Sequence, residues 1–452
     1  MTRQSYRHEL AVAMTMPVAI AMVEGGVAGV LAVKVFGVHE MVLALITAAP
    51  MFANLTSFIW ARLGRGRNKV HVIVAQQVAL LVLLCAIAAL PAGDAGGLAL
   101  AGVVVASRCL LSGIITMRST VWRQNYPRHL RGRITGRLVL IAALIVTVVS
   151  TVVGLVLDAN PHAFRIVYPV AALVASAAVI AMSRVRIRGW RVLRDYEMRP
   201  AIQPTPHGEQ MPVYEYDPAD AKPSIWSVLK HDRTFRTYMT WQFMAGMSNM
   251  MCEPPLTYMV SDQTQLNQPF VVSTILVTSL PMGLAMLSLP VWARLLDRMH
   301  ITRFRVRQAW WWVAAQVLMG IGGLLAFGLG GVAAGVLVIA VGRFVLGISR
   351  GGGLLAWQLG HNDFASRNLT AVYMGAHLTL TGIRGAFTPF LGMALYAGWD
   401  PLRLGSTTLI PGFAGIGPWV FFVAAVLSLT AAVGFYRLSR SVGHRGEPED
   451  MD

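Results

Sequence analysis

Long hydrophobic runs, separated by short polar segments, recur along the whole chain. Each run has about 20 residues, enough to cross a hydrocarbon core of about 30 Å as an α-helix. We place twelve runs, at residues 10–36, 40–61, 69–91, 95–117, 134–157, 161–183, 237–260, 269–291, 308–331, 332–349, 370–397 and 413–436. Only glycines between Gly328 and Gly335 separate the ninth run from the tenth. The pattern predicts an all-α polytopic membrane protein with twelve transmembrane helices.

Composition agrees with this pattern. Hydrophobic residues make up 55% of the chain and charged residues only 13%, whereas a soluble domain carries about 25% charged residues. The first run is too long for the apolar segment of a signal peptide, so we expect no cleavable signal. All three cysteines fall within predicted helices, and no disulfide framework is expected.

The net charge of +17 follows the predicted topology. Of the 38 Lys and Arg residues, all but six are assigned to one membrane face; the six are Lys34, Arg165 and Arg403 on the other face and Arg108, Arg343 and Arg384 inside runs. Basic loops mark the cytoplasmic side. We therefore expect both termini in the cytoplasm, a protein of the cytoplasmic (inner) membrane surrounded by lipid, and no nucleic-acid partner.

Two six-helix bundles with a linker between them are the predicted domains. A basic and then Pro-rich polar stretch follows the sixth run, and "SIWSVLKHDRTFRTY" has the character of an interfacial helix. The boundaries are 1–183 for the N-terminal bundle, 184–236 for the cytoplasmic linker and interfacial helix, 237–438 for the C-terminal bundle and 439–452 for a cytoplasmic tail. After its basic first part, the linker is expected to be poorly ordered.

The two bundles share an internal repeat. Five matches occur in the same order in both halves: Glu24 with Glu253, the two "WARL" segments, Arg108 with Arg343, Trp122 with Trp357, and Thr135 with Thr370. The last three pairs are each 235 residues apart. A duplication explains this order better than chance does, so the bundles are predicted to be pseudo-symmetric.

Motifs in the predicted loops resemble those of a known family. In "SFIWARLGRGRNK", Arg62, Gly64 and Arg65 match the pattern G-x-x-x-D-R-x-G-R-K/R, while Ser57 and Ala61 replace its glycine and its aspartate. A second copy, "ARLLDRMH", keeps Asp297 and Arg298, and "RFVLG" from Arg343 resembles the family's buried-arginine motif. With "YPRHLRGRITGR" before the fifth run, these motifs resemble the major facilitator superfamily over essentially the whole chain.

This resemblance implies a transporter that works by alternating access. Helices 1, 4, 7 and 10 would line a central cavity, helices 2, 5, 8 and 11 would lie between the halves, and helices 3, 6, 9 and 12 would face lipid. Arg62, Arg65, Asp297 and Arg298 would belong to gating loops. Because Ala61 replaces the motif's aspartate, the second-half copy is expected to carry the charge latch of the gate alone.

Six ionisable residues lie deep in the predicted helices: Glu24, Arg108, Glu253, Arg343, His377 and Arg384. None is in helices 3, 6, 9 or 12, and a buried charge needs a partner or water. Counted along the helices, Glu24, Glu253 and Arg384 each lie roughly 21–24 Å from the charged-loop side. We expect the two glutamates to face Arg384 in a water-accessible layer, with "EGGVAGV", "CEPPLTY" and "TGIRGAFTPFLG" supplying helix breakers nearby.

These groups have two competing interpretations. Glu24 and Glu253 are candidate proton carriers or substrate contacts, Arg384 their counter-ion or the anchor of a substrate anion, and His377 a proton relay. Alternatively, Glu24, Glu253 and Arg384 form a structural ion cluster that braces the two halves. Arg108 and Arg343 fit a pathway role and hydrogen bonding to neighbouring helix backbone equally well.

A metal site is the alternative to a proton-coupled solute pathway. Met247, Met251 and Cys252 lie beside Glu253, and thioether and thiol groups suit Cu(I). The copper-importing branch of the superfamily carries M-x-x-x-M here and H-x-x-x-M on the next helix, where this chain has Met282 in place of the histidine. Methionine is also ordinary filler at helix interfaces.

The sequence thus predicts a secondary active transporter for a small molecule or an ion, with proton coupling expected from the buried carboxylates. A copper or iron transporter and a non-transporting sensor or assembly factor on the same fold are the alternatives. No metalloprotease, P-loop or paired C-x-x-C motif occurs, so no enzyme and no cofactor are expected. We expect a monomer.

Overall fold

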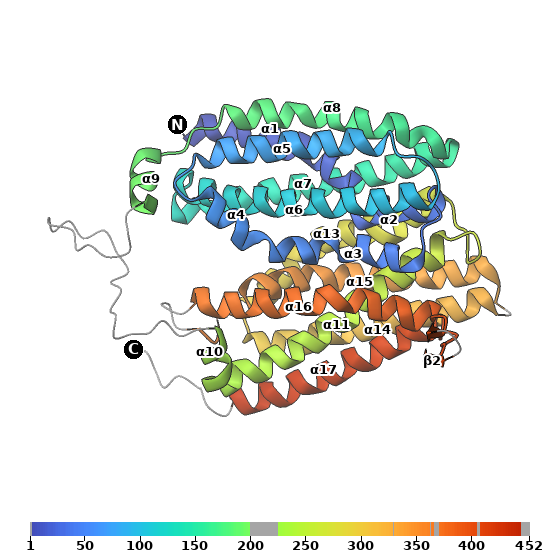
Figure 1. Ribbon diagram of the computed structural model, residues 1–452. Helices are drawn as coiled ribbons and strands as arrows, with labels where there is room; N and C mark the ends of the chain where they lie inside the picture. Colours follow the sequence, from blue (N-terminus) through green and yellow to red (C-terminus); the bar gives the residue numbers. More distant parts are fainter. Residues whose placement is uncertain are drawn as a thin grey trace.

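The computed structural model describes residues 2–198, 225–328, 330–361, 363–365, 370–404 and 407–443. Long helices fill most of them (Figure 1). The N-terminal group of helices, α1–α8, consists of α1 (Thr2–Met22), α2 (Gly25–Lys34), α3 (Glu40–Leu55), α4 (Ser57–Gly64), α5 (Lys69–Ile87), α6 (Asp94–Asn125), α7 (Arg128–Ala159) and α8 (Phe164–Ser183), with a 3-10 turn at Pro161–Ala163.

The C-terminal group, α11–α17, consists of α11 (Arg233–Ser261), α12 (Phe270–Thr274), the π-helix η2 (Ile275–Ser279), α13 (Leu280–Leu296), α14 (Ile301–Phe327), α15 (Gly331–Leu359), α16 (Thr370–Ala397) and α17 (Trp419–Gly443). In Figure 1 the N-terminal group lies above the C-terminal group. Short helices α9 (Trp190–Met198) and α10 (Ile225–His231) lie at one end, here named the linker end.

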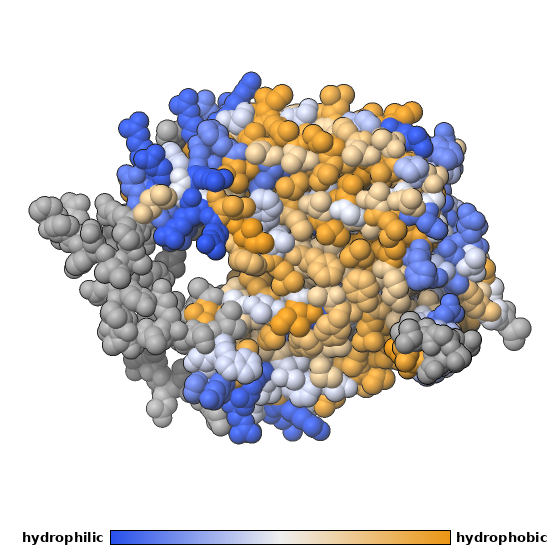
Figure 2. Space-filling view, viewed as in Figure 1, coloured by the Kyte–Doolittle hydropathy of each residue, from blue (hydrophilic) through white to orange (hydrophobic). Residues whose placement is uncertain are grey.

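Each of the twelve predicted runs overlaps one helix or two to three consecutive helices. Among the described residues, nine helices are long and apolar enough to cross a membrane, or ten if the bent pair α3–α4 forms one span. Polar and charged side chains lower the hydropathy of α11 and α16, which are not among them. Figure 2 shows a hydrophobic belt between two hydrophilic ends, as a bilayer requires.

The division between the ninth and tenth predicted helices is confirmed. Helix α14 ends at Phe327, and α15 begins at Gly331, whose φ of +74° lies in the left-handed region open to glycine. Helix α15 then continues to Leu359, ten residues past the predicted end. Arg350 therefore belongs to a candidate membrane helix and not to the loop that follows the tenth predicted run.

Two elements were not predicted. Helix α9 forms within the basic part of the linker, and an antiparallel hairpin, β1 (Leu402–Leu404) and β2 (Thr407–Ile410), precedes α17. The hairpin lies at the end opposite the linker, here named the hairpin end (Figure 1). The segment expected to form an interfacial helix contains the short helix α10 and the beginning of α11. The expectation of a poorly ordered linker falls on residues 199–224 and most of the predicted tail on 444–452, both outside the described residues.

Hydrogen bonds between the two groups gather toward the hairpin end. Lys34 Nζ donates to Asn267 Oδ1 at 3.2 Å, and the Tyr258 hydroxyl donates to Glu40 Oε1 at 3.1 Å. The Asp158 carboxylate accepts from the first backbone N–H groups of α12. At the linker end, by contrast, the space-filling view is hollowed between the two groups (Figure 2).

Close backbone approach at Gly26 holds the groups together near these bonds. A Cβ atom at Gly26 would lie 1.8 Å from Thr278 Oγ1 of η2, whereas one at the neighbouring Gly25 would meet nothing within 4 Å. Only a residue without a side chain fits at Gly26, because packed interiors tolerate added methyl groups poorly.

We predict that Gly26→Ala destabilises the protein by about 1–3 kcal/mol through overpacking. Gly25→Ala is the matched control, since both positions begin α2 and gain the same helix propensity. Thermal unfolding in detergent, followed by tryptophan fluorescence, should show a lower midpoint for Gly26→Ala alone. Equal midpoints for the two variants would contradict the close contact with Thr278.

Candidate functional site

The backbone leaves the helical conformation at Glu24. Helix α1 ends at Met22 and α2 begins at Gly25, while Glu24 is extended with φ −74° and ψ 145°. The break leaves the Val23 carbonyl without a helical partner, and Arg108 Nε of α6 donates to it at 3.0 Å. Arg108 Nη2 also lies 2.6 Å from Glu24 Oε2. One arginine thus neutralises the carboxylate and satisfies the freed carbonyl.

The C-terminal group repeats this arrangement with Glu253 and Arg343. Arg343 Nη1 and Nη2 donate to the two carboxylate oxygens of Glu253, each at 3.3 Å. Its Nε donates to Leu276 O at 2.7 Å and its Nη2 to Val277 O at 2.6 Å. Both carbonyls belong to the π-helix η2, where hydrogen bonding departs from the α-helical pattern. Again one arginine joins a glutamate to the backbone of an irregular helix.

These pairs correct the predicted partner of the glutamates. Arg384 was expected to face both carboxylates, but its Nη1 donates to the Gln242 carbonyl at 2.7 Å, and the glutamates pair with Arg108 and Arg343. Each ion pair lies within one helix group, so these pairs do not brace the two halves. The hydrogen bonding to neighbouring helix backbone, considered for Arg108 and Arg343 as the alternative to a pathway role, is present, together with a carboxylate contact that was not predicted for them.

The two carboxylates keep partial contact with solvent. The side chains of Glu24 and Glu253 are 24% and 26% exposed, whereas those of Arg108 and Arg343 are 11% and 0% exposed. The carboxylate side of each pair is thus less enclosed than the arginine side. The arginine side is enclosed by helix packing.

Arg350 of α15 is a cation that the sequence analysis missed. Its charge acts on Glu24 from the opposite helix group, and its side chain is half-buried. It has no ion pair with any described residue. The predicted run ended at 349, ten residues before the end of α15; the apolar segment "LLAWQL" after the glycines was the signal that the helix continues.

The sequence analysis also missed an ion pair between α1 and α6, which lies nearer the linker end. Arg118 Nε and Nη2 lie 2.9 and 2.6 Å from Glu9 Oε2, and the Glu9 side chain is fully buried. The Arg118 guanidinium also lies 4.8 Å from the ring centroid of Trp122. Glu9 directly precedes the first predicted run, so it was taken as a flanking residue of that run.

The other two predicted pathway residues lie on α16, apart from the glutamates. His377 is 2% exposed, and its ring meets Trp357 edge-on at 5.7 Å. Arg384 is 4% exposed and lies against Gly246 of α11, where a Cβ atom would come within 1.9 Å of its guanidinium carbon. The structure therefore brings the predicted residues into two places, one around the Glu–Arg pairs and one along α16.

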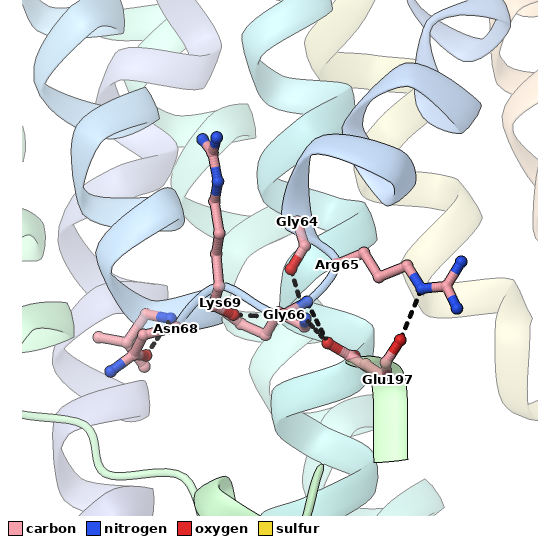
Figure 3. Close-up of polar contacts among 8 residues, drawn as sticks. Gly64, Arg65, Gly66, Asn68, Lys69 and Glu197 are labelled. Carbon is pink, nitrogen blue, oxygen red and sulfur yellow. Dashed lines mark hydrogen bonds and ion pairs between the residues drawn. The ribbon is translucent and has the colours of Figure 1, made fainter. Parts of the chain in front are cut away.

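The loop between α4 and α5 obtains a carboxylate from the linker. Glu197 of α9 accepts from the Gly66 N–H at 2.7 Å and from Lys69 Nζ at 2.6 Å (Figure 3). Arg65 Nε donates to the backbone carbonyl of Glu197 at 2.7 Å. Lys69 is 3% exposed, so this contact neutralises a buried cation. Sequence spacing could not indicate it, because Glu197 is distant in the chain.

The remaining predicted gating residues make fewer contacts. Arg62, Asp297 and Arg298 are exposed, and none forms an ion pair within the described part of the chain. Asp297 follows the last turn of α13. The expected latch in the second-half copy of the motif is thus not formed in this conformation.

The predicted metal residues are packed into the helix interior. Met251 and Cys252 belong to a buried hydrophobic cluster of the C-terminal group, and the Cys252 thiol donates to the Ser248 carbonyl at 3.2 Å. Met247 is half-buried. No group of three His, Cys, Asp or Glu side chains suited to a metal ion occurs in the described ranges. These residues fit helix packing, and the metal alternative has no support.

Comparisons with solved structures show the same fold. A mutant form of the nucleoside transporter NupG is 11% identical with a TM-score of 0.65, covering 96% of this chain and 99% of its own. A D-xylose-proton symporter is 10% identical with a TM-score of 0.63 and 97% of each chain covered. A peptide transporter, POT in complex with sulfate, is 13% identical with a TM-score of 0.64, covering 97% of this chain and 95% of its own.

Sequence comparison shows the family. No curated protein matches this sequence. The family model of the Major Facilitator Superfamily matches residues 10–309, which include nearly the whole N-terminal group and the first helices of the C-terminal group. With its apolar helices, the protein is an integral membrane protein, and it belongs to the Major Facilitator Superfamily.

Proposed function

We propose that this protein is a proton-coupled secondary active transporter that moves a small solute by rocking two six-helix bundles against each other. The bundles would be residues 1–183 and 237–438, with twelve spans in total, a linker at 184–236 and a tail at 439–452. The coincidence of helices with all twelve hydrophobic runs supports this layout. So does the likeness to transporters over nearly the full chain.

The observation that carries this proposal is the repeated Glu–Arg pair. Each partly exposed carboxylate has one buried arginine as its partner, and that arginine also binds carbonyls of an irregular helix. Protonation of Glu24 or Glu253 would remove the charge that holds the arginine. The arginine could then shift against the break at Glu24 or against η2, so that proton binding is linked to helix movement.

The contacts between the helix groups support an assignment of the conformational state. They gather toward the hairpin end, while the linker end is hollowed (Figure 2). Most basic loops belong to the linker end, and basic loops favour the cytoplasm. We therefore assign the linker end and both termini to the cytoplasmic side of the inner membrane, and this conformation to the inward-open state.

The hydrogen bonds between Glu197 and the α4–α5 loop support a role for the linker in gating. They connect α9 to this loop of the N-terminal group through Gly66, Lys69 and Arg65. The loop's own motif lacks its aspartate, with Ala61 in that position. We infer that Glu197 supplies the missing negative charge and that the linker moves with the N-terminal bundle.

We predict that Glu24→Gln and Glu253→Gln each reduce substrate-dependent proton movement at least tenfold, because an amide cannot take up a proton. The measurement uses liposomes with a trapped pH-sensitive dye. The solutes to test are nucleosides, pentoses, dipeptides and small organic anions. Proton movement that continues unchanged in both variants would assign the glutamates a structural role.

Glu9→Gln is the matched control for this experiment. It also removes the carboxylate of a Glu–Arg pair between α1 and α6, but away from the helix break. Size-exclusion profiles in detergent identify any variant that fails to fold. Loss of coupling in Glu9→Gln as severe as in Glu24→Gln would mean that any broken pair inactivates the protein, which contradicts a specific role for Glu24.

We predict that Glu197→Ala makes the Gly66 amide exchange with deuterium about tenfold faster, because a hydrogen bond to a charged acceptor is lost. Hydrogen exchange with mass spectrometry of peptides that cover the α4–α5 loop measures this. Asp195→Ala is the control, since Asp195 is on the same helix but 60% exposed and paired only with its neighbour Arg194 among the described residues. Equal protection of the Gly66 amide in the two variants would contradict its hydrogen bond to Glu197.

A further inference from the structure

Three buried cationic or titratable side chains of the C-terminal group have hydrogen-bonding atoms without partners. Arg305 of α14 is 2% exposed; its Nη1 donates to Gln308 Oε1 at 2.6 Å, but its Nε and Nη2 are buried without a partner among the described residues. The Nε atom of Arg384 and the Nε2 atom of His377 are also buried without a hydrogen-bond partner among the described residues. The Thr381 hydroxyl, one turn from each of the last two, is also buried without a partner there.

The helices that carry these groups pack against common neighbours. Helix α11 packs against both α14 and α16 (Figure 1). Gln308, which accepts from Arg305, lies against α15, and Trp357 of α15 contacts the His377 ring. The positive charges of Arg305 and Arg384 act on His377. No described carboxylate forms an ion pair with Arg305 or Arg384. The cluster is therefore positive and uncompensated within the described part of the chain.

This condition is physically costly. Burial of an ion without a counter-charge carries a penalty of several kcal/mol. Arginine cannot relieve it by losing its proton, because guanidinium stays charged in proteins. Arg108 and Arg343 are arginines whose charge is compensated, because each forms an ion pair with a glutamate of its own helix group. Arg305 and Arg384 lack such a residue in the described ranges, so a bound anion is the natural source of their counter-charge.

The open donors indicate the kind of anion. The Nε and Nη2 atoms of one guanidinium form the edge that binds two oxygens of a carboxylate or phosphate side by side. Arg305 has both atoms of this edge free of described partners. Arg384 is held in place by the Gln242 carbonyl and by the space that Gly246 leaves for its guanidinium. These fixed, planar donors suit an oxyanion better than a spherical halide.

We propose that Arg305, His377 and Arg384 form a buried oxyanion site within the C-terminal group and that the transported substrate carries the carboxylate or phosphate bound there. The second part rests on the proposed transport function, and the first part stands without it. Thr381 and Gln242 complete the polar surroundings of the site. The substrate class is then small organic acids or phosphorylated solutes.

The test is ligand-dependent thermal stability of the full-length protein in detergent. Succinate and inorganic phosphate are titrated against chloride at constant ionic strength. A ligand that binds the folded state raises the unfolding midpoint in proportion to its affinity. We expect succinate or phosphate, but not chloride, to raise it in the wild type, with at least tenfold weaker apparent affinity in Arg384→Gln and in Arg305→Gln.

Arg303→Gln is the matched control, because it removes an exposed arginine of the same helix, α14, with no ion pair among the described residues. Arg384→Lys keeps the charge but removes the planar fork, and we expect it to bind the anion more weakly than the wild type. The wild-type titration needs no variant, so it remains decisive if a variant fails to fold. No preference for oxyanions in the wild type, or unchanged affinity in both Arg→Gln variants, would overturn the site.

Transport of labelled succinate or glycerol phosphate into liposomes separates the two parts of the proposal. Uptake that falls at least tenfold in Arg384→Gln supports an anionic substrate. Anion binding without uptake of any anion, while a neutral solute moves protons through Glu24, would overturn the substrate class. If no solute, neutral or anionic, moves protons in the wild type, the proposed transport function fails, whereas the thermal-stability titration still tests the anion site without any transport.

Discussion

A charge buried in a membrane protein has to be neutralised, and this constraint organises the centre of the structure. Arg108 and Arg343 each bind one glutamate and at least one backbone carbonyl of an irregular helix. The break at Glu24 and the π-helix η2 free these carbonyls, which would otherwise lack partners in a medium without water. Ion pair and helix irregularity thus stabilise one another, in both halves of the repeat.

The placement of these pairs suits a protein whose halves move. Each pair is contained within one helix group, so rocking of the groups would not separate opposite buried charges. Between the groups the contacts include hydrogen bonds, such as Lys34 with Asn267 and Asp158 with the start of α12, and close packing at glycine, as at Gly26. No ion pair joins the two groups among the described residues, and separation of a buried ion pair would cost about 3–5 kcal/mol.

The two helix groups differ in their electrostatics despite their common pattern. In the N-terminal group, Lys69 is neutralised by Glu197 of the linker and Arg118 by Glu9. In the C-terminal group, Arg305 and Arg384 have no carboxylate partner among the described residues. The linker therefore associates electrostatically with the N-terminal loop, while the C-terminal group retains positive charge in its interior.

The sequence by itself determined the class of protein, the positions of the helices and which residues would need partners. Hydrophobic runs of bilayer length leave few alternatives to a helical membrane protein, and a buried Glu24 or Arg343 has to be paired. Which partner each charge obtains was decided by tertiary structure, because Glu24 and Arg108, or Glu197 and Lys69, are brought together only by helix packing. Depth along a helix placed Glu24 and Arg384 in one layer, but it carries no information on the direction in which a side chain points. That direction separated Arg384 from the glutamates.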